Sequence, residues 1–175
     1  LRQAGWTVSV HARGALSTPQ VGPALQDPAP SVRAVLAREL RLLPPATRKA
    51  VAAALLADPH PTVRAELAVG MGSLEPGENE AGLIALARDP DPEVRRLAAQ
   101  QLRTAAEPDA AKQLVTMLGD PSVFVRAAAE TSAIALHALF PLADQVASLL
   151  DRKDATARYH AYNVLGKTGE PRHAT

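Results

Sequence analysis

The stretch from Asp89 to Leu102 reads Asp-Pro-Asp-Pro-Glu-Val-Arg-Arg-Leu-Ala-Ala-Gln-Gln-Leu, and the rest of the chain repeats it. Its Asp-Pro-x-x-x-Val-Arg core begins again at Asp27, Asp58 and Asp120. The arginine that closes this core stands at positions 33, 64, 95 and 126, a constant period of 31 residues, and a looser copy ends at Arg158. A fixed period of this size is typical of a stacked repeat array. The sequence therefore predicts an architecture built from one unit used several times.

Each unit is expected to be a helix, a proline-containing turn and a second helix. In the best copy a helical run reaches Arg88, and Pro90 then prevents the helix from continuing. Asp91 followed by Pro92 is the favoured order of an N-cap and a first helical residue. His60 holds the same cap position in an earlier copy. Two short amphipathic helices cannot bury their apolar faces alone, so neighbouring units must stack.

Small residues occupy one register of the second helices. Ala37, Ala68 and Ala99 each follow the repeated arginine at the same distance. Because a methyl side chain keeps the helix face slim, we expect successive second helices to approach closely there. In the last copy Tyr162 takes this register instead.

A column of aspartates requires a separate cause, since each one lies at the C-terminal end of a helix, where the helix dipole disfavours negative charge. An arginine recurs six residues later in the first four copies and seven residues later in the fifth. The simplest account is a ladder of Asp–Arg pairs along the stack that locks each turn against the next. Its predicted members are Asp27, Asp58, Asp89, Asp120, Asp151, Arg33, Arg64, Arg95, Arg126 and Arg158. Because the pattern recurs in every unit, we interpret it as a packing device and not as catalytic groups.

The recurring Asp-Pro-x-x-x-Val-Arg-x-x-Ala-Ala-x-x-Leu unit resembles the HEAT repeat, in particular the short form named after phycobilisome lyases. This resemblance implies an all-α fold, a right-handed α-solenoid with an aspartate–arginine ladder. The fifth copy departs from the pattern, because Arg152 replaces the proline and Ala157 the valine. We expect one array over residues 1–175, with about five units, a half-unit at the start and a frayed tail from about 169 to 175.

The expected helices cover 1–12, 18–26, 30–42, 46–57, 61–72, 79–88, 92–104, 108–118, 123–137, 141–150 and 155–166. The first of these reads as the second helix of a unit whose first helix is missing, and Trp6 stands in its alanine register. We expect either a continuation of the array before Leu1 or self-association at this end.

The composition excludes several classes of protein. There is no cysteine, so disulfides and thiolate metal sites are impossible. The formal net charge of +1 gives no general attraction to nucleic acid or to a membrane surface. No apolar run reaches the ~20 residues of a membrane span, and the first residues lack the apolar stretch of a signal peptide. We expect a cytoplasmic protein.

Candidate chemistry is sparse. Ala161 to Thr168 fits a relaxed phosphate-loop pattern, but the stretch is expected to be helical, whereas such a loop follows a strand. None of the five histidines pairs at the spacing of a helical metal site. Tyr159, His160 and Asn163 share one helical surface, for which a solvated face is a simpler interpretation than a chemical site. We expect no enzymatic activity, no metal and no cofactor.

The resemblance also implies where a partner would bind, because the second helices of HEAT arrays line a concave face that partners usually contact. We expect positions one, two and five after each repeated arginine to point to this face, and we call them the inner strip. Its residues are Ala34, Val35, Arg38, Ala65, Glu66, Val69, Arg96, Leu97, Gln100, Ala127, Ala128, Thr131, Tyr159, His160 and Asn163.

The composition of the inner strip favours another protein as the partner. Val69 and Leu97 form an apolar centre with a polar rim, which is the usual composition of a protein interface. The predicted partner-binding residues are Arg38, Glu66, Val69, Arg96, Leu97, Gln100, Tyr159, His160 and Asn163. We therefore expect a non-enzymatic binding or scaffolding module.

Two other functions stay open. An accessory role similar to that of the HEAT-type phycobilin lyase subunits would need more aromatic surface than a chain with 3% aromatic residues offers. Nucleic-acid binding, as in the HEAT-like alkylpurine DNA glycosylases, would need lysines and arginines clustered along the groove. Only Arg38 and Arg96 of the inner strip meet that need.

Overall fold

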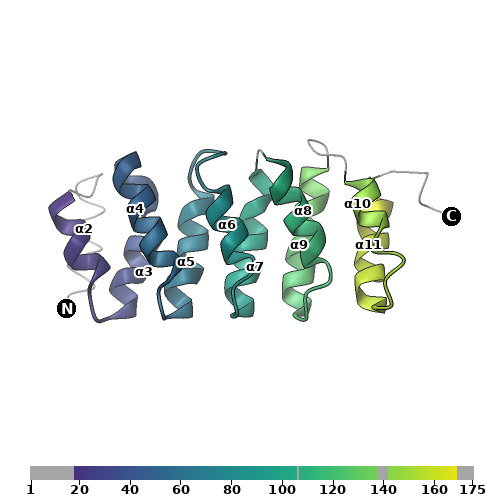
Figure 1. The fold of residues 1–175 in the computed structure, drawn as a ribbon, viewed down its shortest axis with the longest axis horizontal. Coiled ribbons are helices and arrows are strands. Elements are labelled where there is room, and N and C mark those ends of the chain that lie inside the picture. The colour runs from purple at the N-terminus through teal and green to yellow at the C-terminus, as the bar shows by residue number, and fades with distance from the viewer. Residues whose placement is uncertain (1–17, 106, 138–141, 169–175) are drawn as a thin grey trace.

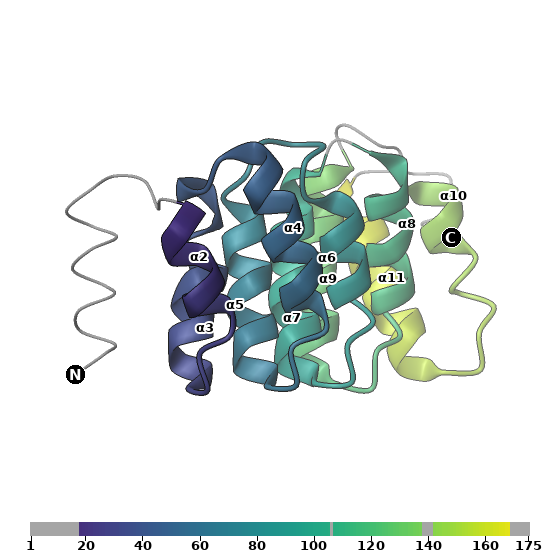
Figure 2. The same ribbon diagram turned by 60° about the vertical axis from the view of Figure 1, so that its left-hand side comes forward.

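The computed structural model describes residues 18–105, 107–137 and 142–168. The expected first helix with Trp6, the open end that we predict there and the tail from residue 169 lie outside the described residues. Figures 1 and 2 show the described part of the chain as a row of helices.

The described residues are helical throughout, with short turns and no strand, so the all-α prediction is confirmed. Two short 3-10 helices, η1 (Leu40–Leu42) and η2 (Leu102–Thr104), extend the second helices of two units. The α-helices are α2 (Thr18–Leu25), α3 (Pro30–Arg38), α4 (Pro45–Leu56), α5 (Pro61–Gly72), α6 (Glu80–Leu86), α7 (Pro92–Gln101), α8 (Pro108–Met117), α9 (Val123–Leu136), α10 (Ala143–Ala147) and α11 (Ala155–Thr168).

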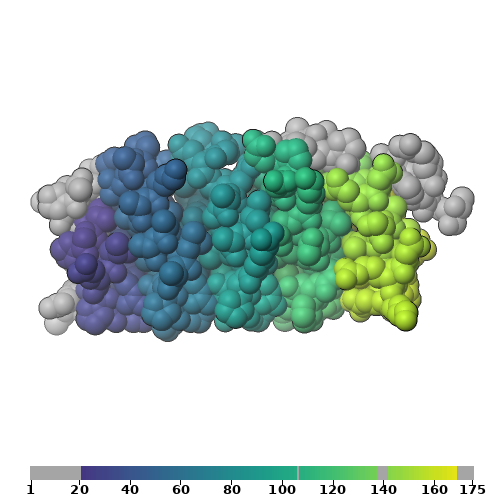
Figure 3. Space-filling model, viewed as in Figure 1, coloured from purple at the N-terminus to yellow at the C-terminus, as the bar shows by residue number. Residues whose placement is uncertain are grey.

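These helices pack as consecutive pairs, from α2 with α3 to α10 with α11, and the pairs follow one another along the long axis of the molecule (Figures 1 and 3). The second helices form one layer, in which α3 packs on α5, α5 on α7 and α7 on α9 (Figure 2). The first helices form the other layer, where neighbours are less closely packed. The predicted helical solenoid is therefore confirmed.

The helix boundaries differ from the predictions mainly at helix ends. The expected helix over 30–42 divides into α3 and η1, and the one over 92–104 divides into α7 and η2. A 3-10 turn commonly tightens the end of an α-helix, and here it buries Leu40 and Leu102 in the core. The helix expected over 141–150 is shorter, as α10 ends at Ala147.

Proline opens many of these helices, and a side chain caps several. Pro92 is the first residue of α7, where its missing N–H leaves no hydrogen bond unmade. The Asp91 carboxylate accepts hydrogen bonds from the backbone N–H groups of the next helical turn. At the start of α5 the Nδ1 atom of His60 accepts from the Thr62 N–H at 3.3 Å, so the predicted cap role of His60 is confirmed.

Small residues let the second helices touch, as expected from the alanine register. Ala37, Ala68 and Ala99 are fully buried between neighbouring units. The closest approach is at Gly70 of α5, where an added Cβ atom would lie 2.0 Å from the carbonyl oxygen of Ala37 in α3. The backbone of one second helix therefore rests directly on the backbone of the previous one.

Candidate functional site

The second-helix layer carries most of the inner strip at its surface, and its charged residues pair with one another. Arg38 of α3 binds Glu66 of α5 with 2.8 Å between Nε and Oε2. Arg96 of α7 donates to Glu93 from Nε at 2.7 Å and from one terminal nitrogen at 2.6 Å. The two arginines that the sequence offers for anion binding along the strip are thus each held by a carboxylate of this chain.

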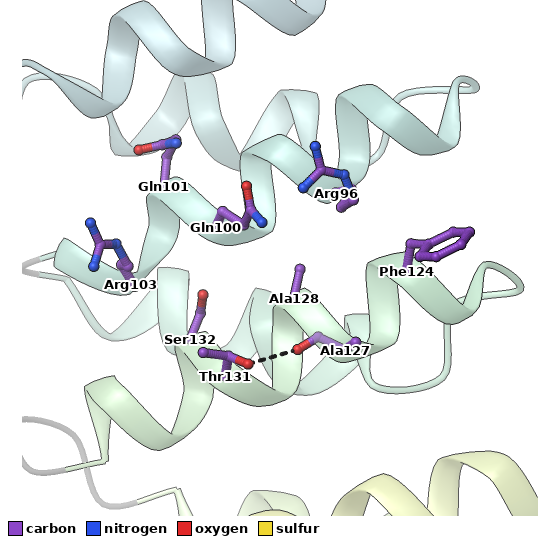
Figure 4. A pocket seen from close by; sticks show the side chains of 9 residues that line it. All are labelled: Arg96, Gln100, Gln101, Arg103, Phe124, Ala127, Ala128, Thr131 and Ser132. Carbon is purple, nitrogen blue, oxygen red and sulfur yellow. Dashed lines mark hydrogen bonds between the residues drawn. The ribbon is translucent and has the colours of Figure 1, made fainter.

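A groove of about 540 Å³ runs between α7 and α9 on this layer, and we call it the α7–α9 groove (Figure 4). Inner-strip residues form much of its surface, including Arg96, Gln100, Ala127 and Thr131. Its full lining is Arg96, Gln100, Gln101, Arg103, Phe124, Ala127, Ala128, Thr131 and Ser132. Its volume is about twice that of the hollow between α5 and α7, at about 270 Å³.

A smaller hollow of about 270 Å³ lies between α5 and α7 and has a different character. Its charged lining residues are all acidic: Glu66, Asp91 and Glu93. Leu97, half-buried, forms part of its apolar surface, and Val69 is half-buried on α5. The apolar centre that the sequence places at Val69 and Leu97 is therefore modest in area.

The prediction of the strip missed four lining residues: Gln101, Arg103, Phe124 and Ser132. Phe124 is the most exposed large apolar side chain of the described residues, at 71%. It precedes Thr131 by seven residues, and residues seven apart share a helix face. Phe124 stands two positions before the repeated arginine Arg126, so a strip that included positions before each arginine would have contained it.

The aspartate–arginine pairs join successive units. Arg33 donates from Nε to Asp58 at 2.6 Å and from a terminal nitrogen at 3.0 Å. Arg64 binds Asp89 and Arg95 binds Asp120 in the same two-pronged way, always 25 residues ahead. In each case the other terminal nitrogen donates to the backbone carbonyl of the aspartate six residues before the arginine, in its own unit. One arginine thus links two neighbouring turns.

The aspartates also hold their own turns, which explains why a carboxylate is tolerated at a helix C-terminus. Asp58 accepts from the backbone N–H of His60 at 2.9 Å. Burial acts to raise the pKa of the Asp58 carboxyl, but the hydrogen bonds from Arg33 and from that N–H outweigh it and hold this pKa below its ordinary value. The pKa of Asp89 is lowered by the same balance, with Arg64 as the donor.

The next step along the stack is different. Arg126 donates from Nε to Nε2 of His160 at 3.3 Å, where earlier units would present an aspartate. The other ring nitrogen of His160 lies 2.8 Å from Glu130 Oε2. Glu130 also accepts from Lys167 at 3.0 Å and from Asn163 at 3.4 Å. We call Arg126, Glu130, His160, Asn163 and Lys167 the terminal cluster.

Three expectations near the terminal cluster need correction. His160 was expected on a solvated face, but its side chain is buried and both ring nitrogens are engaged, so its ring is not displayed on the inner strip. Asp151 is exposed and makes no ion pair within the described residues. Arg158 donates to the carbonyls of Arg152 and Lys153 instead. The extra residue between Asp151 and Arg158 removes this aspartate from the position that the others hold.

The remaining predicted residues are at the surface. Tyr159 is exposed and its ring meets the His160 ring edge-on at 5.2 Å, while Asn163 is half-buried. The stretch from Ala161 to Thr168 belongs to α11, so it is helical as expected and does not form a phosphate loop. Within the described residues there is no group of three or more His, Asp or Glu side chains placed to hold a metal ion. None of the described helices is long and apolar enough to cross a membrane.

Comparison with known proteins places the groove within a recognised repeat. Residues 80–138 match a family model described as HEAT repeats. The matched segment contains α6 to α9 and thus both helices that form the α7–α9 groove. No curated protein matches the chain. HEAT repeats generally mediate contacts between proteins, and the family is typically a non-enzymatic scaffold. The phycobilisome-lyase form of the repeat stays a prediction.

Proposed function

Because this chain is a HEAT-repeat protein, we propose that it is a non-enzymatic binding module that holds another protein against its inner strip. The observation that carries this proposal is the α7–α9 groove. It is hollow, it lies on the second-helix layer, and it has Phe124 at its rim with 71% of its surface exposed. An exposed aromatic side chain next to a groove is a common anchor of protein interfaces.

The charge distribution supports a protein partner over nucleic acid. A nucleic-acid surface requires unpaired basic side chains in a row. Arg38 and Arg96 instead form ion pairs with Glu66 and Glu93. The hollow between α5 and α7 adds acidic side chains to the same layer, which would repel phosphates.

The proposal is tested by charge substitution on the strip. Arg96→Glu combined with Gln100→Glu places two carboxylates in the α7–α9 groove, four residues apart. We expect capture of the native partner from extracts of the source organism to fall about tenfold or more, as for substitutions at interface anchors. Circular dichroism should show unchanged helicity.

The matched control is Lys112→Glu combined with Thr116→Glu. Both residues are exposed on α8 in the first-helix layer, and the change of charge and the spacing are the same as in the groove variant. Capture should be unaffected by this control. Loss of capture in the control variant, with retention in the groove variant, would place the interface on the opposite layer.

A further inference from the structure

The α7–α9 groove contains polar side chains that the protein itself does not use. Gln100, Arg103 and Ser132 all line it, and within the described residues none of their side chains makes a hydrogen bond or an ion pair. Ser132 is 1% exposed. Figure 4 shows its side chain directed from α9 toward the space between the two helices.

This pattern separates the groove from the rest of the inner strip. Thr131, on the same helix, donates to the carbonyl oxygen of Ala127 at 3.0 Å, and Arg96 and Arg38 are bound by carboxylates. The side chains of Gln100 and Arg103 are therefore two polar groups of the groove lining that no contact in the described part of the chain occupies. Groups left unsatisfied in this way in one hollow are suited to hydrogen bonds with a ligand.

The charge of the groove lining indicates which kind of ligand the groove would bind. Its lining includes two arginines and no carboxylate. At one end Arg96 is neutralised by Glu93, and Phe124 stands beside it (Figure 4). At the other end Arg103 is exposed and carries an uncompensated positive charge. The groove thus has an apolar, neutral end and a cationic end.

We propose that the α7–α9 groove binds an extended acidic segment of the partner protein, with a carboxylate at Arg103 and an apolar side chain against Phe124. A guanidinium binds a carboxylate in a two-pronged manner. The Gln100 amide and the Ser132 hydroxyl bond to the main chain of the segment between these two ends. The floor of the groove is made of Ala127 and Ala128, and their small side chains let a main chain approach closely.

The geometry sets the spacing of the two recognised residues. Arg96 lies beside Phe124 and so marks the apolar end of the groove (Figure 4). Arg96 and Arg103 are seven positions apart, which at about 1.5 Å per helical residue is roughly 10 Å along the helix axis. An extended chain rises about 3.3 Å per residue. The acidic and the apolar residue of the bound segment therefore lie three to four positions apart, by this estimate.

The proposal rests on the proposed function, and synthetic peptides test it separately from the native partner. The probes are fluorescent eight-residue peptide libraries with Asp or Glu fixed three or four positions from Leu or Phe. Matched libraries carry Lys or Gln in place of the acidic residue. Fluorescence anisotropy should show binding of the acidic libraries that is about tenfold tighter than that of the lysine libraries, the size of effect given by one well-placed charged contact.

Single substitutions test whether the peptides bind in the α7–α9 groove. Arg103→Glu should weaken binding of the acidic libraries about tenfold or more. Arg41→Glu is the matched control, because Arg41 is an exposed residue of η1 as Arg103 is of η2, outside the groove. Ser132→Ala should also weaken binding without lowering the melting temperature, since its hydroxyl has no partner in the free protein.

Equal binding of lysine and acidic libraries would overturn the proposal, as would equal binding of an oligothymidine of the same length. Acidic binding that Arg103→Glu does not change would also overturn it. If no library binds while the Arg96→Glu, Gln100→Glu variant still loses its native partner, the acidic-segment proposal fails and the proposed function stands. If that variant retains its partner as well, both fail.

Discussion

Single residues set how closely the units approach, and Gly70 is the clearest case. No other residue type fits between α5 and α3 there, because a Cβ atom would meet the Ala37 carbonyl oxygen at 2.0 Å and that of Arg38 at 3.0 Å. The atoms in the way belong to backbone, which cannot rotate aside as a side chain can. Ala37 and Ala68 of the alanine register also keep the helix surfaces small near this contact.

We predict that Gly70→Ala destabilises the protein by about 3 kcal/mol, at the upper end of the range for overpacked cores. In a chain of this size this corresponds to a fall of roughly 6–12 °C in melting temperature. Gly166→Ala is the control, because it also replaces a helical glycine but has nothing within 4 Å of the added atom. It should raise stability by about 0.5–1 kcal/mol through helix propensity. Equal effects of the two substitutions would refute the close contact.

Turns are the elements that the aspartate–arginine pairs connect. Asp89 accepts from Arg64 of the previous unit and from the backbone N–H of Asp91 in its own turn. Its side chain is nearly buried, at 6% exposure. Removing the Asp89 carboxylate leaves the largely buried guanidinium of Arg64 without its counterion. It also removes the hydrogen bond from the Asp91 N–H that holds the turn.

We predict that Asp89→Ala lowers the free energy of unfolding by about 1.5–3 kcal/mol, the range for hydrogen bonds to charged groups. Asp109→Ala removes the carboxylate of an exposed ion pair with Lys112 and should leave the melting temperature unchanged. Chemical denaturation of both variants measures the difference. Indistinguishable denaturation midpoints would show that the pairs have no part in holding the stack together.

The contact between α9 and α11 contains the charged and polar side chains of the terminal cluster. Glu130 stands in the register where earlier units have a buried alanine, and it meets His160 and Lys167 across the seam. Burial acts to raise the pKa of Glu130, but the hydrogen bonds from His160, Lys167 and Asn163 outweigh it and lower this pKa. The last pair of helices is therefore attached to α9 through charged and polar side chains at the register where earlier units have a buried alanine, in addition to its apolar contacts.

This attachment should depend on pH. A lowered pKa in the folded state means that the ionised carboxylate stabilises the fold above the ordinary glutamate pKa of about 4.3, and that this contribution is lost as the pH falls through the folded value. Hydrogen exchange should show that α11 loses protection below about pH 4 before α5 and α7 do. In Glu130→Gln the protection of α11 should already be low at pH 7. Uniform loss of protection along the chain in both proteins would contradict this account.

At the scale of the whole molecule, the period of the arginines was enough to predict the pairs of helices and their order. Three units repeat the proline that opens the second helix, at Pro30, Pro61 and Pro92, so this helix start is specified three times. Handedness and the extent of the array before residue 18 stay predictions.

The groove could not be predicted in the same way, because it depends on side chains from two helices that the sequence separates by about one unit. Phe124 and Ser132 hold no special place in the repeat, and only packing of α9 against α7 brings them opposite Gln100 and Arg103. The repeat pattern favours a solvated surface for His160, because nothing in that pattern indicates that Arg126 contacts a histidine. Departures from the repeat are where this sequence was least informative.

The most direct test of the central claim is site-specific photo-cross-linking in the source organism. A benzophenone amino acid replaces Gln100 in the groove or Lys112 on α8, and irradiated samples are analysed by mass spectrometry. The account predicts a discrete cross-linked protein from position 100 and none from position 112. Cross-links from position 112 with none from position 100 would contradict it.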